Sequence, residues 1–181
     1  MARRHQHEPD DADRDLGPVA DPESVARTIV LAKLTASAKS RQELADALAS
    51  RNVPDGVANR VLDRFEQVGL VDDTAFAEAW VASRQRSRGL SRRALRHELH
   101  RKGVNDEAIT AALEQVDSES ERAAATELVE RKLASTRRLD PDRRTRRLLG
   151  LLARKGYGPA LATSVVREAL ASEDVSDRTL G

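Results

Sequence analysis

Apolar residues recur at helical spacing along most of the chain, and capping residues divide this pattern into segments. Ser40 and Glu43 have the capping-box arrangement, in which the side chain of each residue satisfies a free backbone N–H of the other. Leu44 and Leu48 follow one turn apart on one face, and Asn52 can end the segment in the left-handed conformation. The pattern predicts an all-α protein, helical from residue 21 to about residue 170.

The capping signals predict the start of each helix, because Ser, Asp and Asn accept from free N–H groups and Pro fits the first turn. The expected starts are Asp21-Pro22, Ser40, Pro54, Asp72 or Asp73, Ser91, Asn105, Ser118, Asp140-Pro141 and Pro159. The first helix should run to about Ser37. Its inward residues are expected to be Val25, Ile29, Val30 and Leu34.

The predicted helices repeat in groups of three. Alignment of Arg51-Asn52-Val53, Lys102-Gly103-Val104 and Lys155-Gly156-Tyr157 gives spacings of 51 and 53 residues, and it also superposes Leu48, Leu99 and Leu152. A unit of this size buries little surface alone and should be stabilised by its neighbour. We therefore expect tandem three-helix repeats over residues 23–70, 71–117 and 118–171, stacked in an elongated, curved array.

Both ends of the chain are acidic and lack apolar periodicity. Residues 1–22 and 172–181 are therefore expected to be disordered tails. Residues 1–23 carry three arginines and seven acids, a net charge of −4, against +7 for residues 24–170. Because an acidic tail competes with other anions for a basic surface, its removal should strengthen DNA binding.

Charge is unevenly distributed, although the net charge of the whole chain is only +1. Residues 84–102 contain eight basic residues and one acid, residues 103–130 one basic residue and eight acids, and residues 131–155 ten basic residues and two acids. Such blocks indicate a polyanion-binding face beside an acidic face. The alternative, that these runs are solvated helix faces in an arginine-rich protein, stays open.

The basic residues fall mainly on the second helix of the middle and last units. When the leucines of these helices point inward, the arginines turn outward. Guanidinium groups suit phosphate and carboxylate recognition because they present fixed paired donors. The candidate contact residues are Arg84, Arg86, Arg88, Arg92, Arg93, Arg96, Arg101, Lys102, Arg143, Arg146, Arg147 and Arg154.

The sequence carries no motif of an enzyme or a cofactor site. Cysteine is absent, and neither a phosphate-binding loop nor a nucleophile elbow is present. His97 and His100 lie three residues apart, whereas a zinc-protease helix needs a spacing of four. No apolar run reaches the roughly 20 residues of a membrane span. We expect a cytoplasmic, monomeric protein without enzyme activity, cofactor or metal.

The second and third helices of each unit resemble a helix-turn-helix. In the middle unit, however, the third helix carries Asp106, Glu107 and Glu114, which oppose docking into a DNA groove. Phe76 and Trp80 share one helix face and suit a core better than base stacking. Any DNA contact is therefore expected to be weak, made through phosphates and insensitive to sequence.

The middle unit contains a recognisable combination of residues. Residues 69–77 read Gly-Leu-Val-Asp-Asp-Thr-Ala-Phe-Ala, and Arg84, Gly89, Arg92, Leu99 and Lys102-Gly103-Val104 follow. This combination resembles the RecX family, bacterial regulators of the RecA recombinase. Residues 152–157, Leu-Ala-Arg-Lys-Gly-Tyr, are similar to the C-terminal repeat of that family. The resemblance covers about residues 24–170, and the acidic N-terminal tail is not part of the family pattern.

The resemblance implies three tandem three-helix repeats in a curved molecule that lies along the groove of the RecA filament on DNA. It also implies inhibition of the ATPase and strand-exchange activities of RecA, in recombination, DNA repair and the SOS response. The expected partners are the RecA filament and DNA. Two alternatives stay open: a stand-alone helix-turn-helix DNA-binding regulator, and a helical-repeat adaptor for another protein.

Overall fold

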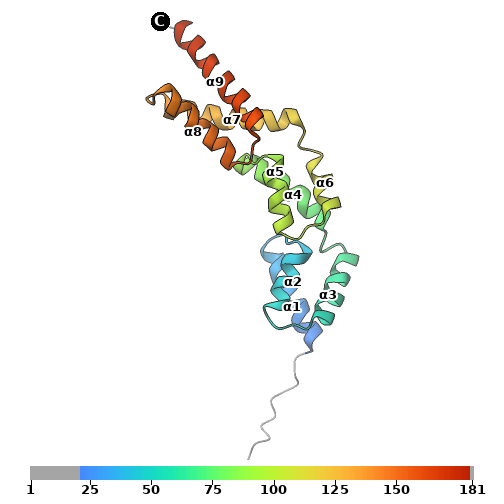
Figure 1. Ribbon diagram of the computed structural model, residues 1–181. Coiled ribbons are helices and arrows are strands. Elements are labelled where there is room, and N and C mark those ends of the chain that lie inside the picture. The colour runs from blue at the N-terminus through green and yellow to red at the C-terminus, as the bar shows by residue number, and fades with distance from the viewer. Residues whose placement is uncertain (1–20, 180–181) are drawn as a thin grey trace, which may run out of the picture.

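The computed structural model describes residues 21–179, and in this range the chain forms nine helices and no strands (Figure 1). The helices are α1 (Pro22–Ala36), α2 (Arg41–Ala49), α3 (Asp55–Gln67), α4 (Asp73–Arg88), α5 (Arg92–Arg101), α6 (Asp106–Leu113), α7 (Ser118–Thr136), α8 (Pro141–Arg154) and α9 (Pro159–Thr179). The predicted all-α fold is confirmed. Most of the predicted N-terminal tail, residues 1–20, lies outside the described residues.

Each group of three consecutive helices packs around a core of its own. The central buried side chains are Val30, Leu44, Leu48 and Leu62 in the first unit, Leu95, Leu99, Ile109 and Leu113 in the middle unit, and Val129, Leu148, Leu152 and Val165 in the last unit. The units follow one another along an elongated, bent molecule (Figure 1). The tandem three-helix architecture predicted from the repeat is therefore confirmed.

Most helices begin and end where the capping signals predict. Ser40 Oγ accepts from the Glu43 N–H, and the Glu43 carboxylate accepts from the Ser40 N–H, which completes the capping box. Asn52 ends the α2 segment with a φ of 57°, in the left-handed region. Further side-chain caps at the predicted positions are Asp21, Asp72, Ser91, Asn105 and Asp140.

Two local predictions are wrong. Asp117, rather than Ser118, caps α7, because its carboxylate accepts from the Ser120 N–H. Asp and Ser are both favourable N-cap residues, so residue type alone does not show which of these two adjacent residues caps the helix. On α1, Val25 is 38% exposed and Ala26 is fully buried. Periodicity favours Val25 because a small buried residue carries little weight in an apolar pattern.

The last helix is longer than the apolar pattern predicts. α9 continues to Thr179, so the boundary expected at residue 171 falls inside a helix. Glu173, whose side chain is 8% exposed, forms ion pairs with Arg137 and Arg144. The hydrogen bond from Arg137 lowers the pKa of Glu173 against the opposing effect of burial, and Arg144 adds to the shift. This part of α9 is held by charge, which hydrophobic periodicity does not reveal.

The first and middle units meet where the turn between α5 and α6 lies against the start of α2. Ser40 Oγ donates to the Lys102 carbonyl at 2.6 Å, and the Arg41 N–H donates to Asp73 Oδ1 at 2.8 Å. Gly103 has a φ of 73°, and a Cβ at this position would come within 2.3 Å of the Gln42 Cβ. Glycine is required here both by the backbone conformation and by the close approach of α2.

The same arrangement recurs between the middle and last units, where the turn between α8 and α9 lies against the start of α5. The Ser91 N–H donates to the Lys155 carbonyl at 3.0 Å, and the Arg92 N–H donates to Glu121 Oε1 at 2.9 Å. A Cβ on Gly156 would come within 2.5 Å of Ser91 Oγ. Because both joints use equivalent positions, each unit is attached to the next in a similar way.

Candidate interaction surface

The predicted contact residues lie on three helices of the middle and last units. Arg84, Arg86 and Arg88 belong to α4; Arg92, Arg93, Arg96 and Arg101 belong to α5, with Lys102 at its end; and Arg143, Arg146, Arg147 and Arg154 belong to α8. The structure divides them into two groups. Some side chains form ion pairs or hydrogen bonds within the protein, and others are exposed to solvent.

Lys102 is used within the protein, at the joint between the first and middle units. Its Nζ lies 2.6 Å from Glu43 Oε1 and 4.1 Å from the centroid of the Trp80 ring, and its side chain is 19% exposed. Against the effect of burial, the hydrogen bond from Lys102 lowers the pKa of Glu43, and the Ser40 N–H acts in the same direction. Lys102 therefore connects two units and presents little charge to a partner.

Arg84 belongs to a charged cluster between α4 and α5. Its guanidinium lies over the Trp80 ring, with the carbon 4.0 Å from the centroid, and its Nε is 3.4 Å from Glu98 Oε2. Trp80 Nε1 donates to the same carboxylate oxygen at 2.9 Å, and Arg88 Nη1 lies 4.0 Å from Glu98 Oε1. Glu98 therefore neutralises charge inside the middle unit, and Arg84 has a structural role.

The start of α5 combines structural and exposed arginines. Arg92 is half-buried and donates from Nη1 to the Val116 carbonyl at 3.3 Å. Arg93 is exposed, although its Nε donates to the Gly156 carbonyl at 3.2 Å. These two residues and Arg96 line a groove of 420 Å³ at the joint with the last unit. An anion bound in this groove would contact both units.

The arginines of α8 form the most exposed part of the surface. Arg143, Arg146, Arg147 and Arg154 are all exposed. Among residues 21–173, Arg143 pairs only with Asp140 at the start of its own helix, at 3.2 Å, and such exposed pairs contribute little. The guanidinium groups of Arg147 and Arg154 have no ion-pair or hydrogen-bond partner among residues 21–173. Within this part of the chain, α8 therefore carries charge that no acid neutralises.

The structure adds one cation that the sequence prediction omits. Lys132, on α7, lines a hollow of 160 Å³ with Thr136 and with Arg147, Leu148, Leu151 and Arg154 of α8. Lys132 belongs to the basic segment 131–155, which is the signal that could have included it. The sequence argument assigns outward positions on one helix at a time. It therefore does not show that Lys132 of α7 lies beside the arginines of α8.

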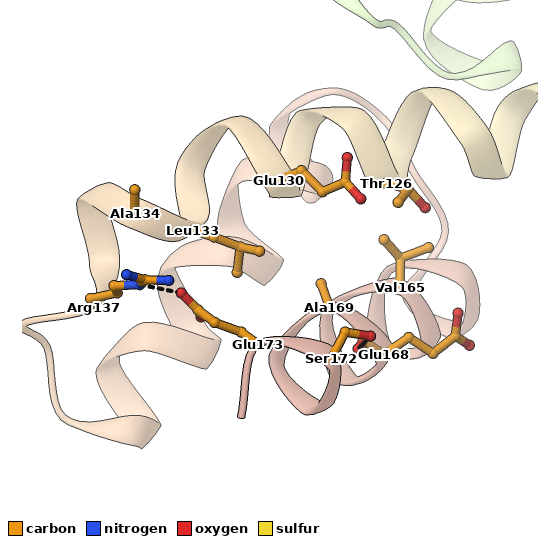
Figure 2. Close-up of a pocket in the computed structure, with 10 residues that line it drawn as sticks. All are labelled: Thr126, Glu130, Leu133, Ala134, Arg137, Val165, Glu168, Ala169, Ser172 and Glu173. Carbon is orange, nitrogen blue, oxygen red and sulfur yellow. Dashed lines mark hydrogen bonds and ion pairs between the residues drawn. The ribbon is translucent and has the colours of Figure 1, made fainter. Parts of the chain in front are cut away.

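A second hollow in the last unit has the opposite character. This hollow of 520 Å³ lies between α7 and α9 (Figure 2). Leu133, Val165 and Ala169 supply its apolar part, and Figure 2 shows Arg137 paired with Glu173 at one end. Its other charged residues are Glu130 and Glu168. The cavity therefore does not extend the basic surface.

Other functional classes find no structural support within the described part of the chain. No cluster of His, Asp or Glu side chains in this part could hold a metal ion. None of its helices is long and apolar enough to cross a membrane.

Three end-to-end helical units with exposed arginines define a tandem helical-repeat protein, in which successive units present an extended surface. Family models described as the first, second and third three-helix domains of RecX match residues 26–65, 72–113 and 119–166. The chain belongs to the RecX family, and this confirms the resemblance seen in the sequence.

Relatives and solved structures agree with this assignment. "Regulatory protein RecX" of Streptomyces lividans is 51% identical over 164 residues, covering 91% of this chain and 87% of the relative. The protein of the same name from Thermobifida fusca is 47% identical over 169 residues, covering 92% and 91% of the two chains. The crystal structure of RecX from Lactobacillus salivarius matches with a TM-score of 0.73 at 18% identity, over 83% of this chain and 98% of that one. The family is therefore one of regulatory proteins.

Proposed function

We propose that this protein is a non-enzymatic modulator of the RecA recombinase, which binds the RecA–DNA filament in its groove and inhibits ATP hydrolysis and strand exchange. The observation that carries the proposal is the row of exposed arginines on α8, together with those on α5, in an array whose units are joined in a similar way. An elongated array can contact several subunits of a filament. Its arginines would bind acidic filament surfaces or nearby phosphates.

The protein would act in the cytoplasm, as a monomer, by binding alone. A protein that bridges neighbouring filament subunits stabilises the subunit spacing to which it binds most tightly. Changes in that spacing then become less favourable, and this would inhibit the filament. Direct DNA binding would be weak and insensitive to sequence, because phosphate contacts carry no direct base information. This role fits regulation of recombination, DNA repair and the SOS response.

The stand-alone helix-turn-helix regulator is supported less well. Asp106, Glu107 and Glu114 of α6 are all exposed in the structure. A recognition helix with three exposed carboxylates would be repelled by the phosphate backbone. The exposed arginines of α5 and α8 likewise favour a polyanionic partner over an adaptor role that involves no nucleic acid.

The decisive experiment measures ATP hydrolysis by RecA on single-stranded DNA in the presence of the full-length protein. We expect turnover to fall as the protein is added, while the protein alone hydrolyses no ATP. A variant with four reversed charges should need at least about tenfold higher concentration for the same inhibition and should bind with weaker salt dependence. Its substitutions are R93E, R96E, R143E and R147E.

The matched control also reverses four arginines, all of them exposed on the first unit and outside the predicted surface. Its substitutions are R27E, R51E, R60E and R64E. Circular dichroism should show unchanged helical content for the test variant, because its four positions point away from the core. Unchanged RecA turnover at saturating parent protein would exclude the proposed function. Equal loss in the two variants would show that only total charge matters.

A further inference from the structure

The middle and last units can be superposed residue by residue through their buried positions. Ala77 and Val81 of α4 correspond to Ala125 and Val129 of α7, and Leu95 and Leu99 of α5 correspond to Leu148 and Leu152 of α8. All of these side chains are buried in their units. This alignment allows the side chains between α4 and α5 to be compared, position by position, with those between α7 and α8.

In the middle unit this space holds a carboxylate. Glu98 accepts from Trp80 Nε1 at 2.9 Å, and it pairs with Arg84 at 3.4 Å and with Arg88 at 4.0 Å. Its side chain is 23% exposed. The middle unit therefore supplies its own anion to the cations at this position.

In the last unit the cation is retained but the carboxylate is replaced. Lys132 stands at the position of Arg84, and Leu151 stands at the position of Glu98. Two further cations line this space, because Arg147 replaces Ala94 and Arg154 corresponds to Arg101. The result is the hollow of 160 Å³ between α7 and α8, whose lining contains three cations and no acid.

The three cations have no neutralising partner within the described chain. Lys132, Arg147 and Arg154 are exposed, and none of their charged groups forms an ion pair or hydrogen bond with a residue whose side chain the structure describes. Around them, Leu148 is buried and Leu151 is half-buried, so one side of the hollow is apolar. An apolar wall reduces screening by water and strengthens the attraction for an anion.

We propose that this hollow binds phosphate groups of a nucleic-acid backbone, and that the anion occupies the place that Glu98 fills in the middle unit. The proposal rests on the proposed function, and it identifies where the basic surface contacts DNA. Arg147 and Arg154 lie two helical turns apart, a rise of about 10 Å. A single carboxylate cannot reach both ends or neutralise three cations. A chain of phosphates can do both, and arginine binds phosphate oxygens through paired donors.

The first test removes two charges from the hollow and compares them with two charges removed from the first unit, outside the basic surface. Binding of a fluorescein-labelled oligothymidylate is measured against salt concentration for R147Q/R154Q and for the control R51Q/R64Q, both in the full chain. We expect at least about tenfold weaker binding for the hollow variant and at most about threefold for the control. The salt slope should fall by about 0.7 for each phosphate that the variant no longer binds.

The second test restores the missing carboxylate and leaves every cation in place. In L151E the new side chain should pair with the cations of the hollow and displace the phosphate, so oligothymidylate binding should fall about as far as in R147Q/R154Q. L151Q is the matched uncharged control and should bind nearly as the parent does. Circular dichroism and thermal unfolding establish that both variants fold. The R147Q/R154Q result stands independently of any repacking at Leu151.

Equal weakening in R147Q/R154Q and R51Q/R64Q, or equal binding by L151E and L151Q, would overturn the proposal. Binding of polyglutamate with no binding of oligothymidylate would overturn it in favour of an acidic protein partner.

The RecA ATPase assay on the same proteins distinguishes failure of the proposed phosphate site from failure of the proposed function. If the parent inhibits RecA while the hollow variants match their controls in DNA binding, the site fails and the proposed function stands. If the parent leaves RecA unaffected, the proposed function fails whatever the oligonucleotide shows.

Discussion

Tyr157 is the single tyrosine of the chain, and it shows how one buried side chain closes a joint between units. It is 3% exposed, and its hydroxyl donates to the Gly89 carbonyl at 3.1 Å. Burial raises the pKa of Tyr157 to about 12, and the carboxylate of Glu121 acts in the same direction. The neutral phenol is the form that the folded protein stabilises.

We expect the ultraviolet titration of the folded protein to show phenolate formation near pH 12, against pH 10 for the chain in denaturant. Because the folded pKa is the higher one, the stabilisation is fully present below pH 10 and is lost as the pH rises through about 12. The single tyrosine makes the signal unambiguous. A native midpoint near pH 10 would mean that the hydroxyl is open to water and that the joint is looser than described.

Among the helices, α9 depends most clearly on charge for its length. Its first part packs through Ala162, Val165 and Val166, whereas Glu173 is held by Arg137 and Arg144. These arginines come from the end of α7 and from α8, so the carboxylate connects all three helices of the last unit. An acidic segment without apolar periodicity is thereby attached to the core.

Glu173→Gln should destabilise the protein by about 1.5–3 kcal/mol at pH 7, the usual range for hydrogen bonds to charged groups. The pKa of Glu173 is lowered from 4.5, so its stabilisation is present above that pH and is lost as the pH falls through the folded pKa. Urea unfolding at pH 7 and at pH 3 should therefore show a smaller pH effect in E173Q than in the parent. E168Q, at an exposed residue paired with Arg122, is the control and should behave nearly as the parent. Identical behaviour of the two variants would contradict the anchoring role.

Over the full length of the protein, oppositely charged segments can compete with one another. The structure reduces the charge that the N-terminal tail has available for this competition. Asp21 caps α1 and Glu23 pairs with Arg60 at 3.1 Å, so two of the seven acids of residues 1–23 already have partners. The remaining five acids stand against three arginines.

Deletion of residues 1–20, which leaves the Asp21 cap intact, should strengthen binding to unrelated DNA sequences several-fold at low salt. The gain should disappear at high salt, because both the tail and DNA compete electrostatically for the same arginines. Mobility-shift titrations of the full-length and truncated proteins on several duplexes and single strands provide the measurement. Equal affinity with and without the tail would exclude masking, and tight binding to one sequence at high salt would favour the helix-turn-helix alternative.

The secondary structure and the repeat follow from the amino-acid sequence alone, because both are encoded by short-range rules. Caps such as Ser40 and Asn105 act on the next turn, and Leu48, Leu99 and Leu152 mark the same core position in each unit. The family resemblance rests on the same features. The hydrophobic pattern is a poorer guide where a small or a charged residue makes the contact with the core, as at Ala26 and in the last part of α9.

Which basic residues are available to a partner depends instead on how the helices pack. Twelve candidates look alike in the sequence, yet Arg84 is paired with Glu98 and Lys102 with Glu43, whereas Arg147 and Arg154 are exposed. The physical reason is that neutralisation depends on which acid lies within a few ångströms, and for Lys102 that acid lies 59 residues away along the chain. Local periodicity places a side chain on a face of its own helix, but the packing of other helices determines what that face meets.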